Sequence, residues 1–211
     1  MRIRAHLTSR LAATAALALS LAAGPLLAVE PFKADYQANY MGLQANAQMS
    51  LAADGQNRWK YVLDIGGAGA RLTQSTTFET SGEQWRPLSS TDTQRGESGL
   101  GAMLVKNRSS QATYDWSRNE ARWTGDVKAE ESGPVRLQPG DVDGMLLNLV
   151  LVRDVAAKRP LSYRLVEDGR AKNQAYQRAG TEAITVAGKE HRAVKVVRTD
   201  GSRQITAWIV E

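Results

Sequence analysis

The 211-residue chain contains no cysteine and only two histidines, His6 and His191. The absence of cysteine excludes disulfides, thiolate nucleophiles, iron–sulfur clusters and zinc sites that use cysteine. Any Ser-His-Asp triad outside the N-terminal segment would have to use His191, which stands in a charged turn typical of an exposed side chain. The sequence therefore predicts no cofactor, no metal site and no catalytic residues.

Residues 1–28 have the pattern of a secretory signal peptide. The first ten residues carry three arginines and no acidic residue, an Ala/Leu-rich run fills residues 11–23, and Gly24-Pro25 ends it. A positive start, a short apolar run and a small residue at the cut are typical of such a peptide. We therefore expect export to the periplasm and cleavage near Val29. The alternative is an uncleaved membrane anchor, for which the apolar run is short.

Loss of the leader would leave residues 29–211, the size of one domain. Because the leader carries three arginines and no acidic residue, its removal lowers the net charge from +5 to +2. A nucleic-acid-binding protein needs a clustered basic stripe, which this balance does not favour. The content of hydrophobic residues, 42%, and of charged residues, 23%, is that of an ordinary globular domain.

Alternation of apolar and polar residues dominates residues 29–211. Residues 32–40 and 43–51 alternate strictly and predict a hairpin, and similar segments continue to residue 210. Residues 172–179 and 182–186 read as two separate strands, and the glycine-rich segments 66–70 and 96–101 read as loops between strands. The sequence predicts a mostly β domain, an antiparallel curved sheet or an incomplete β-barrel.

Residues 143–155 differ from this pattern and predict one short buried helix. The segment is long for a strand and apolar nearly all round, so that as a helix it would be buried on most sides, Leu149 included. Asp141 and Asp143 precede it and are explained as helix caps more simply than as metal ligands. A buried strand remains the alternative, because periodicity alone does not exclude it.

Aromatic side chains are spread over many of the predicted strands. They would line an apolar cavity for a lipid or acyl chain, as side chains inside β-barrels do, or they would simply fill the core. The candidate ligand-binding residues are Tyr36, Tyr40, Trp59, Tyr61, Trp116 and Trp123. The first functional hypothesis is thus a non-catalytic periplasmic binding or carrier module. The second is a structural or interaction protein of the cell envelope that binds another protein through a sheet edge or face. The third is a secreted hydrolase that uses Asp or Ser, which clustered carboxylates with perturbed pKa values in a cleft would favour.

The order of several features resembles an exported bacterial family catalogued as domain of unknown function 3108. These features are the opening hairpin at 36–51, Tyr114-Asp115-Trp116, and the lead-in at 137–143 to a Leu-rich segment. The resemblance covers most of residues 32–210 and implies an exported β-rich domain with a curved or barrel-like sheet and little helix. It brings no activity and no catalytic residues. Gly144 stands where the family commonly has serine.

The last predicted strand, residues 204–210, carries apolar groups on both faces. The resembling family continues with further strands after this point, whereas this chain ends at Glu211. We therefore expect an open edge that self-associates or receives a strand from a partner.

Overall fold

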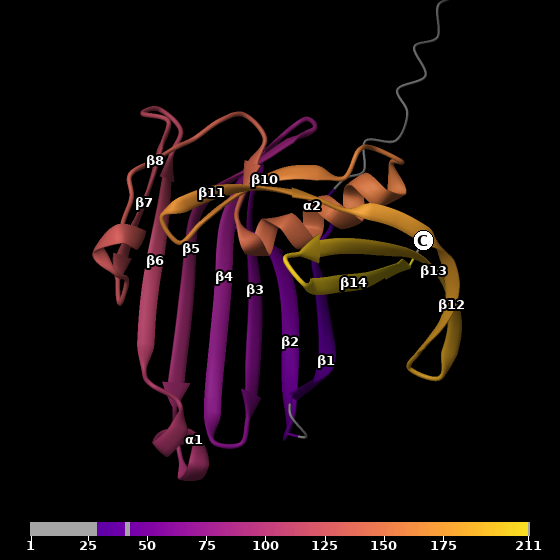
Figure 1. The fold of residues 1–211 in the computed structure, drawn as a ribbon, viewed down its shortest axis with the longest axis horizontal. Coiled ribbons are helices and arrows are strands. Elements are labelled where there is room, and N and C mark those ends of the chain that lie inside the picture. Colours follow the sequence, from indigo (N-terminus) through magenta and orange to yellow (C-terminus); the bar gives the residue numbers. More distant parts are fainter. Residues whose placement is uncertain (1–28, 41–42, 211) are drawn as a thin grey trace, which may run out of the picture.

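A computed structural model describes residues 29–40 and 43–210 (Figure 1). The predicted signal peptide, residues 1–28, lies outside the described residues. Among the residues described, no helix combines the length and apolarity needed to cross a membrane. The described chain is mostly β, with antiparallel sheets, few helices and no closure of the sheet, as the sequence predicts.

Eight strands form one broad antiparallel sheet in which every strand pairs with its neighbour in the sequence (Figure 1). The strands are β1 (Phe32–Tyr40), β2 (Leu43–Ala53), β3 (Arg58–Gly67), β4 (Ala70–Ser81), β5 (Gln84–Gly96), β6 (Arg108–Asp115), β7 (Glu120–Gly125) and β8 (Val135–Arg136). The predicted opening hairpin is confirmed, with Phe32 opposite Leu51 and Tyr36 opposite Ala47. Because side chains alternate between faces, each strand presents one set of side chains to the interior.

The predicted helix is confirmed as α2 (Gly144–Ala156), which packs on one face of the broad sheet, here called the inner face. Asp143 is its N-cap and accepts a hydrogen bond from the backbone N–H of Leu146. The expectation that the helix is buried on most sides is only partly correct. Leu149 is partly buried, and Val152 is 49% exposed. One side of an apolar helix is therefore left uncovered.

Asp141 has a different role from the predicted one. Its carboxylate accepts hydrogen bonds from the backbone N–H of Gln138, at 2.8 Å, and from Arg164, at 2.5 Å. It therefore holds the turn before the helix and does not cap the helix itself, because only the capping residue directly before the first turn reaches the free N–H groups.

Two three-stranded sheets lie over the inner face (Figure 1). Their strands are β9 (Asp141–Val142), β10 (Ser162–Glu167), β11 (Arg170–Ala175), β12 (Gln177–Val186), β13 (Lys189–Asp200) and β14 (Arg203–Val210). The predicted division into 172–179 and 182–186 is wrong, because the break falls at Tyr176. Gly180, with φ of +105°, instead lies in an irregularity within β12, where the pairing register shifts.

The glycine-rich segments, predicted as loops, pack against each other, and the second includes a helix, α1 (Gly99–Leu104). The backbone N–H groups of Glu97 and Ser98 both donate to the carbonyl of Gly69. A Cβ on Gly101 would lie 2.1 Å from the same carbonyl oxygen, so the close approach requires glycine at position 101.

The main hydrophobic core joins the inner face of the broad sheet to α2 and to strands β9, β10, β13 and β14. Its most deeply buried side chains include Phe78, Leu146 and Val196, which come from the sheet, the helix and β13. A second cluster, around Ala121 and Trp123, lies between β6, β7 and β10. The core thus fixes α2 across the sheet while leaving the helix side around Val152 uncovered.

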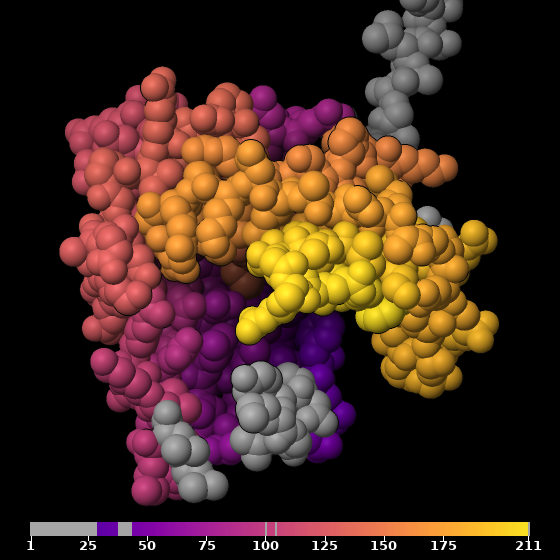
Figure 2. Space-filling model, viewed as in Figure 1, coloured from indigo at the N-terminus to yellow at the C-terminus, as the bar shows by residue number. Residues whose placement is uncertain are grey.

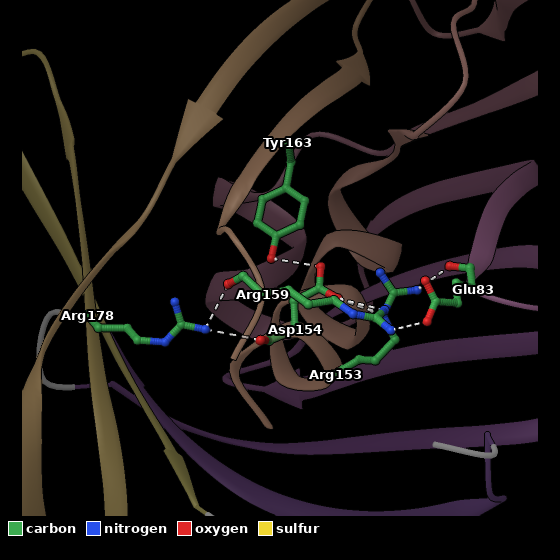
Figure 3. A network of polar contacts seen from close by, with 6 residues as sticks. All are labelled: Glu83, Arg153, Asp154, Arg159, Tyr163 and Arg178. Carbon is green, nitrogen blue, oxygen red and sulfur yellow. Dashed lines mark hydrogen bonds and ion pairs between the residues drawn. The ribbon is translucent and has the colours of Figure 1, made fainter. Parts of the chain in front are cut away.

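A buried polar network holds the C-terminal end of α2 (Figure 3). Asp154, 5% exposed, accepts hydrogen bonds from Arg153 Nε at 2.8 Å and from the hydroxyl of Tyr163 at 3.2 Å. Burial and the Asp154 carboxylate raise the pKa of Tyr163 well above its ordinary value. Arg178 of β12 donates to the carbonyls of Asp154 and Arg159. The helix is therefore tied to both overlying sheets at this end.

Candidate functional site

An apolar groove of about 700 Å³ lies between β1–β3, α2 and β14. Its volume is within the roughly 300–1,000 Å³ of ligand pockets, and its surface is mostly apolar. The apolar side chains that line it include Phe32, Tyr36, Met49, Tyr61, Leu149 and Val152. In the space-filling view, β10, β11 and β14 cover only part of the inner face, and the surface is hollowed below them (Figure 2).

Four large apolar side chains of this groove are exposed. Phe32 is 37% exposed, Tyr36 is 47% exposed, Val152 is 49% exposed and Trp208 is 44% exposed. They come from β1, α2 and β14, which are far apart in the sequence and line the same groove. Apolar side chains exposed together on the wall of a cavity mark an interaction site, whereas single exposed apolar residues are ordinary.

Tyr61 lies at the base of this apolar surface. It is 2% exposed, its ring lies 6.0 Å from that of Phe32, and its hydroxyl donates to the sulfur of Met49 at 3.1 Å. Burial, and to a lesser extent Tyr36, raise the pKa of Tyr61 to about 12. Tyr61 therefore presents a neutral, apolar ring to the groove at any physiological pH.

The groove carries little free charge at the end nearest β5. Arg153 lines it, but its guanidinium lies over the ring of Trp85 at 4.8 Å and pairs with Asp154 at 2.8 Å. Trp208 lies at the rim, where its indole N–H donates to Glu182 of β12 at 2.7 Å. Its polar atom is thus used within the overlying sheet.

The six aromatic residues predicted from the sequence do not share one cavity. Tyr36 and Tyr61 line the apolar groove, and Trp59 is partly buried against the main core. Tyr40 ends β1, and its side chain lies outside the described residues.

The remaining two candidate tryptophans lie elsewhere. Trp123 is 7% exposed and lines a separate polar cleft, and Trp116 lines a third cavity of about 460 Å³ beside Trp85. The groove residues that the sequence did not point to as a binding surface include Phe32 and Met49, and also Leu149 and Val152, which lie in the segment 143–155 that was predicted to be buried on most sides. The one signal in the sequence was that residues 143–155 lack the polar side expected of a helix with a solvent-exposed face.

The polar cleft, of about 370 Å³, adjoins the groove on the inner face. It lies between β4–β6, the first turn of α2 and the end of β10. Gln74 and Asp92 meet at its centre, where the Gln74 amide donates to Asp92 Oδ2 at 2.8 Å. The other carboxylate oxygen, Asp92 Oδ1, is buried and has no hydrogen-bond partner among the described residues.

Two further carboxyl groups of the cleft are electrostatically perturbed. Burial raises the pKa of Asp143 to about 6, against the lowering effect of hydrogen bonds from Leu146 and Thr76. Burial, and next the neighbouring Asp168, raise the pKa of Glu167. Raised pKa values in a cleft are one signature of catalytic acids. However, both oxygens of Asp143 are engaged in capping α2 and in accepting the Thr76 hydroxyl, at 2.7 Å and 2.5 Å, so this group has a structural role.

The described residues contain no cluster of three or more His, Asp or Glu side chains that could hold a metal ion. No family model matches this chain, and searches of curated proteins and of solved structures found no match either. The resemblance to the family of unknown function therefore stays a prediction, and function has to be argued from the groove and the cleft.

Proposed function

We propose that this protein is an exported, non-catalytic binding or carrier module that holds the acyl chain of a lipid in the apolar groove. The observation that carries the proposal is the uncovered side of α2. A helix that is apolar all round is normally buried on all sides. Here Leu149 and Val152 instead line a groove whose lining also includes the exposed Phe32 and Tyr36.

An acyl chain fits this surface by its chemistry. It is apolar and flexible, and it demands no hydrogen bonds from the groove. Transfer of each buried methylene from water contributes about 0.8 kcal/mol. Export to the periplasm, which the pattern of residues 1–28 predicts, would bring the groove into contact with membrane lipids.

The test compares two aspartate substitutions at valines of equal exposure. Val152 lies in the groove, whereas Val186 lies at the end of β12, and both are 49% exposed. Decanol, an uncharged chain, is titrated into wild type, Val152→Asp and Val186→Asp, with displacement of an uncharged fluorescent probe as the readout. In Val152→Asp the new carboxylate would lose its water to the bound decanol, so binding should be weakened at least tenfold, about 1.4 kcal/mol. Val186→Asp should bind decanol as wild type does.

Equal weakening by both substitutions, or no binding to wild type, would contradict the proposal. Unfolding curves of both variants check that the fold is intact. Native mass spectrometry of the protein purified from its own periplasm would show a copurified lipid directly.

The alternative, a structural protein that binds a partner through a sheet edge, is favoured by a different observation. Within residues 29–40 and 43–210, β14 pairs with β13 alone, so its other edge carries no strand. Ile205 and Val210 on this strand are 41% and 43% exposed. Exposed apolar edges are templates for strand addition. Sedimentation over a concentration series tests this alternative, and a strict monomer with protected amides along residues 204–210 would refute it.

A further inference from the structure

Part of the inner face of the broad sheet changes from apolar on β2 and β3 to polar on β4 and β5. One row of directly paired residues crosses five strands, from β2 to β6. In order it consists of Met49, Leu63, Gln74, Asp92 and Ser110. The β2 and β3 positions are apolar, and the β4, β5 and β6 positions are polar.

The adjacent row on the same face repeats this change on β4 and β5 and is apolar again at β6. It consists of Leu51, Tyr61, Thr76, Ser90 and Ala112. Tyr61 and Leu51 belong to the main core, while the Thr76 hydroxyl donates to Asp143 at 2.5 Å. A sheet face that packs on a helix is ordinarily apolar along its whole width, so the polar positions on β4 and β5 need another explanation.

The apolar groove and the polar cleft are neighbours along this boundary. Asn148 of α2 lines both of them. Tyr61 lines the groove and Leu63 lines the cleft, and these two residues lie on the same face of β3, roughly 7 Å apart. One elongated molecule could therefore lie in both cavities at once.

We infer that the ligand is an amphiphile whose acyl chain lies in the groove and whose uncharged, hydroxyl-rich headgroup, such as a sugar, lies in the cleft. This inference rests on the proposed function, because the chain must occupy the groove. Hydroxyl groups both donate and accept hydrogen bonds, and the cleft offers both partners in the amides of Gln74 and Asn148 and in the carboxylate of Asp92. Asp92 Oδ1 in particular has no donor within residues 29–40 and 43–210.

The charge of the cleft argues against a phosphate or sulfate headgroup. Four carboxyl groups line it, those of Asp92, Asp143, Glu167 and Asp168, whereas Arg108 is the one basic side chain of the lining. Arg108 also donates from Nε to the carbonyl of Asp126, at 3.1 Å. An anion in the cleft would meet mostly like charge, which raises its energy.

The experiment measures binding of decyl maltoside, decyl sulfate, maltose and decanol, each amphiphile below its critical micelle concentration. A double variant, Gln74→Leu/Asp92→Leu, removes both members of the cleft pair, so that neither is left without its partner. The matched control is Asp35→Leu/Gln48→Leu. In that pair the Gln48 amide donates to Asp35 at 2.7 Å, and pairing places both residues on the other face of β1 and β2.

Decyl maltoside should bind wild type at least tenfold more tightly than decyl sulfate and than maltose. The cleft double variant should bind decyl maltoside at least tenfold more weakly than wild type does, and its affinity for decanol should stay within about twofold of wild type. The control double variant should change neither affinity. Failure of decanol to bind wild type would overturn the proposed function. If decanol binds, any one of three results would overturn the inference. These are an unchanged affinity of the cleft double variant for decyl maltoside, an affinity of wild type for decyl sulfate equal to that for decyl maltoside, and an affinity of wild type for maltose equal to that for decyl maltoside.

Discussion

Asp143 ties the first turn of α2 to β4 from a position where it is only 3% exposed. Its Oδ1 accepts the N–H of Leu146, and its Oδ2 accepts the hydroxyl of Thr76. Both hydrogen bonds favour the carboxylate, but loss of water outweighs them and raises the pKa from 3.8 to about 6. This group should therefore make the stability of the fold depend on pH in an unusual direction.

A carboxyl group whose pKa is higher in the folded state binds its proton more tightly there. Its contribution to stability is fully present below about pH 4 and is lost as the pH rises through about 6. The rise in pKa corresponds to about 3 kcal/mol, at 1.36 kcal/mol for each pH unit. Acidic residues with lowered pKa values, such as Asp115 and Glu182, act in the opposite direction. A comparison with a variant is therefore needed to isolate Asp143.

Asp143→Asn removes the titration and keeps the geometry. The asparagine oxygen still accepts the Leu146 N–H, and its amide donates to the Thr76 hydroxyl, whose proton then turns to the carbonyl of Ser89 at 3.3 Å. Urea unfolding of both proteins is followed from pH 4 to pH 7. The free energy of unfolding of wild type minus that of the variant should fall by about 2 kcal/mol over this range, because part of the change lies outside it.

Glu190→Gln is the matched control, because it neutralises an exposed carboxyl group on β13. Its unfolding free energy should run parallel to that of wild type. Parallel curves for Asp143→Asn and wild type would refute the assignment of a buried, proton-binding carboxyl group at the start of α2.

Three further substitutions test the fold around the site by urea unfolding. Leu151→Ala should lower the free energy of unfolding by about 2–5 kcal/mol, because the Leu151 side chain is 6% exposed. Val152→Ala should change it by less than about 1 kcal/mol. Equal effects of the two substitutions would contradict the orientation of α2. Tyr114→Phe should lower it by about 1–3 kcal/mol, since it removes the donor to the buried carbonyl of Val166, at 3.1 Å; a neutral result would show that the hydrogen bond is not formed. Gly101→Ala should lower the midpoint of unfolding, because its Cβ would lie 2.1 Å from a carbonyl oxygen; an unchanged midpoint would mean that the two glycine-rich segments do not touch.

The local pattern of the sequence was sufficient for the strands and for α2. Strict alternation in residues 32–51 predicts the first hairpin, and Asp143 before an apolar run predicts where α2 begins. It was not sufficient where one residue type serves several structures. The predicted division at 179–182 falls where Gly180 permits an irregularity inside β12, and the glycine-rich segment 96–101 was predicted as a loop although the short helix α1 begins in it.

The candidate site was less predictable, because it depends on contacts between distant segments. Among the candidate ligand-binding residues, Tyr36 and Tyr61 line the apolar groove, and their role in binding stays a prediction. Trp116 and Trp123 share their residue type and strand context, yet they lie in other cavities. The spacing of apolar residues does not show which side of an apolar helix is left uncovered. The whole segment 143–155, which includes Val152, was therefore predicted to be buried on most sides.

The most direct test of the central claim is an NMR titration that follows methyl groups of the protein as decanol is added. We expect saturable shifts of the methyls of Met49, Leu149 and Val152, which line the groove. The methyls of Met103 and Val186, 83% and 49% exposed and outside the groove, should not move. Equal shifts at Met103 and Val186, or shifts that never saturate, would show adsorption over the whole surface and would contradict a binding groove.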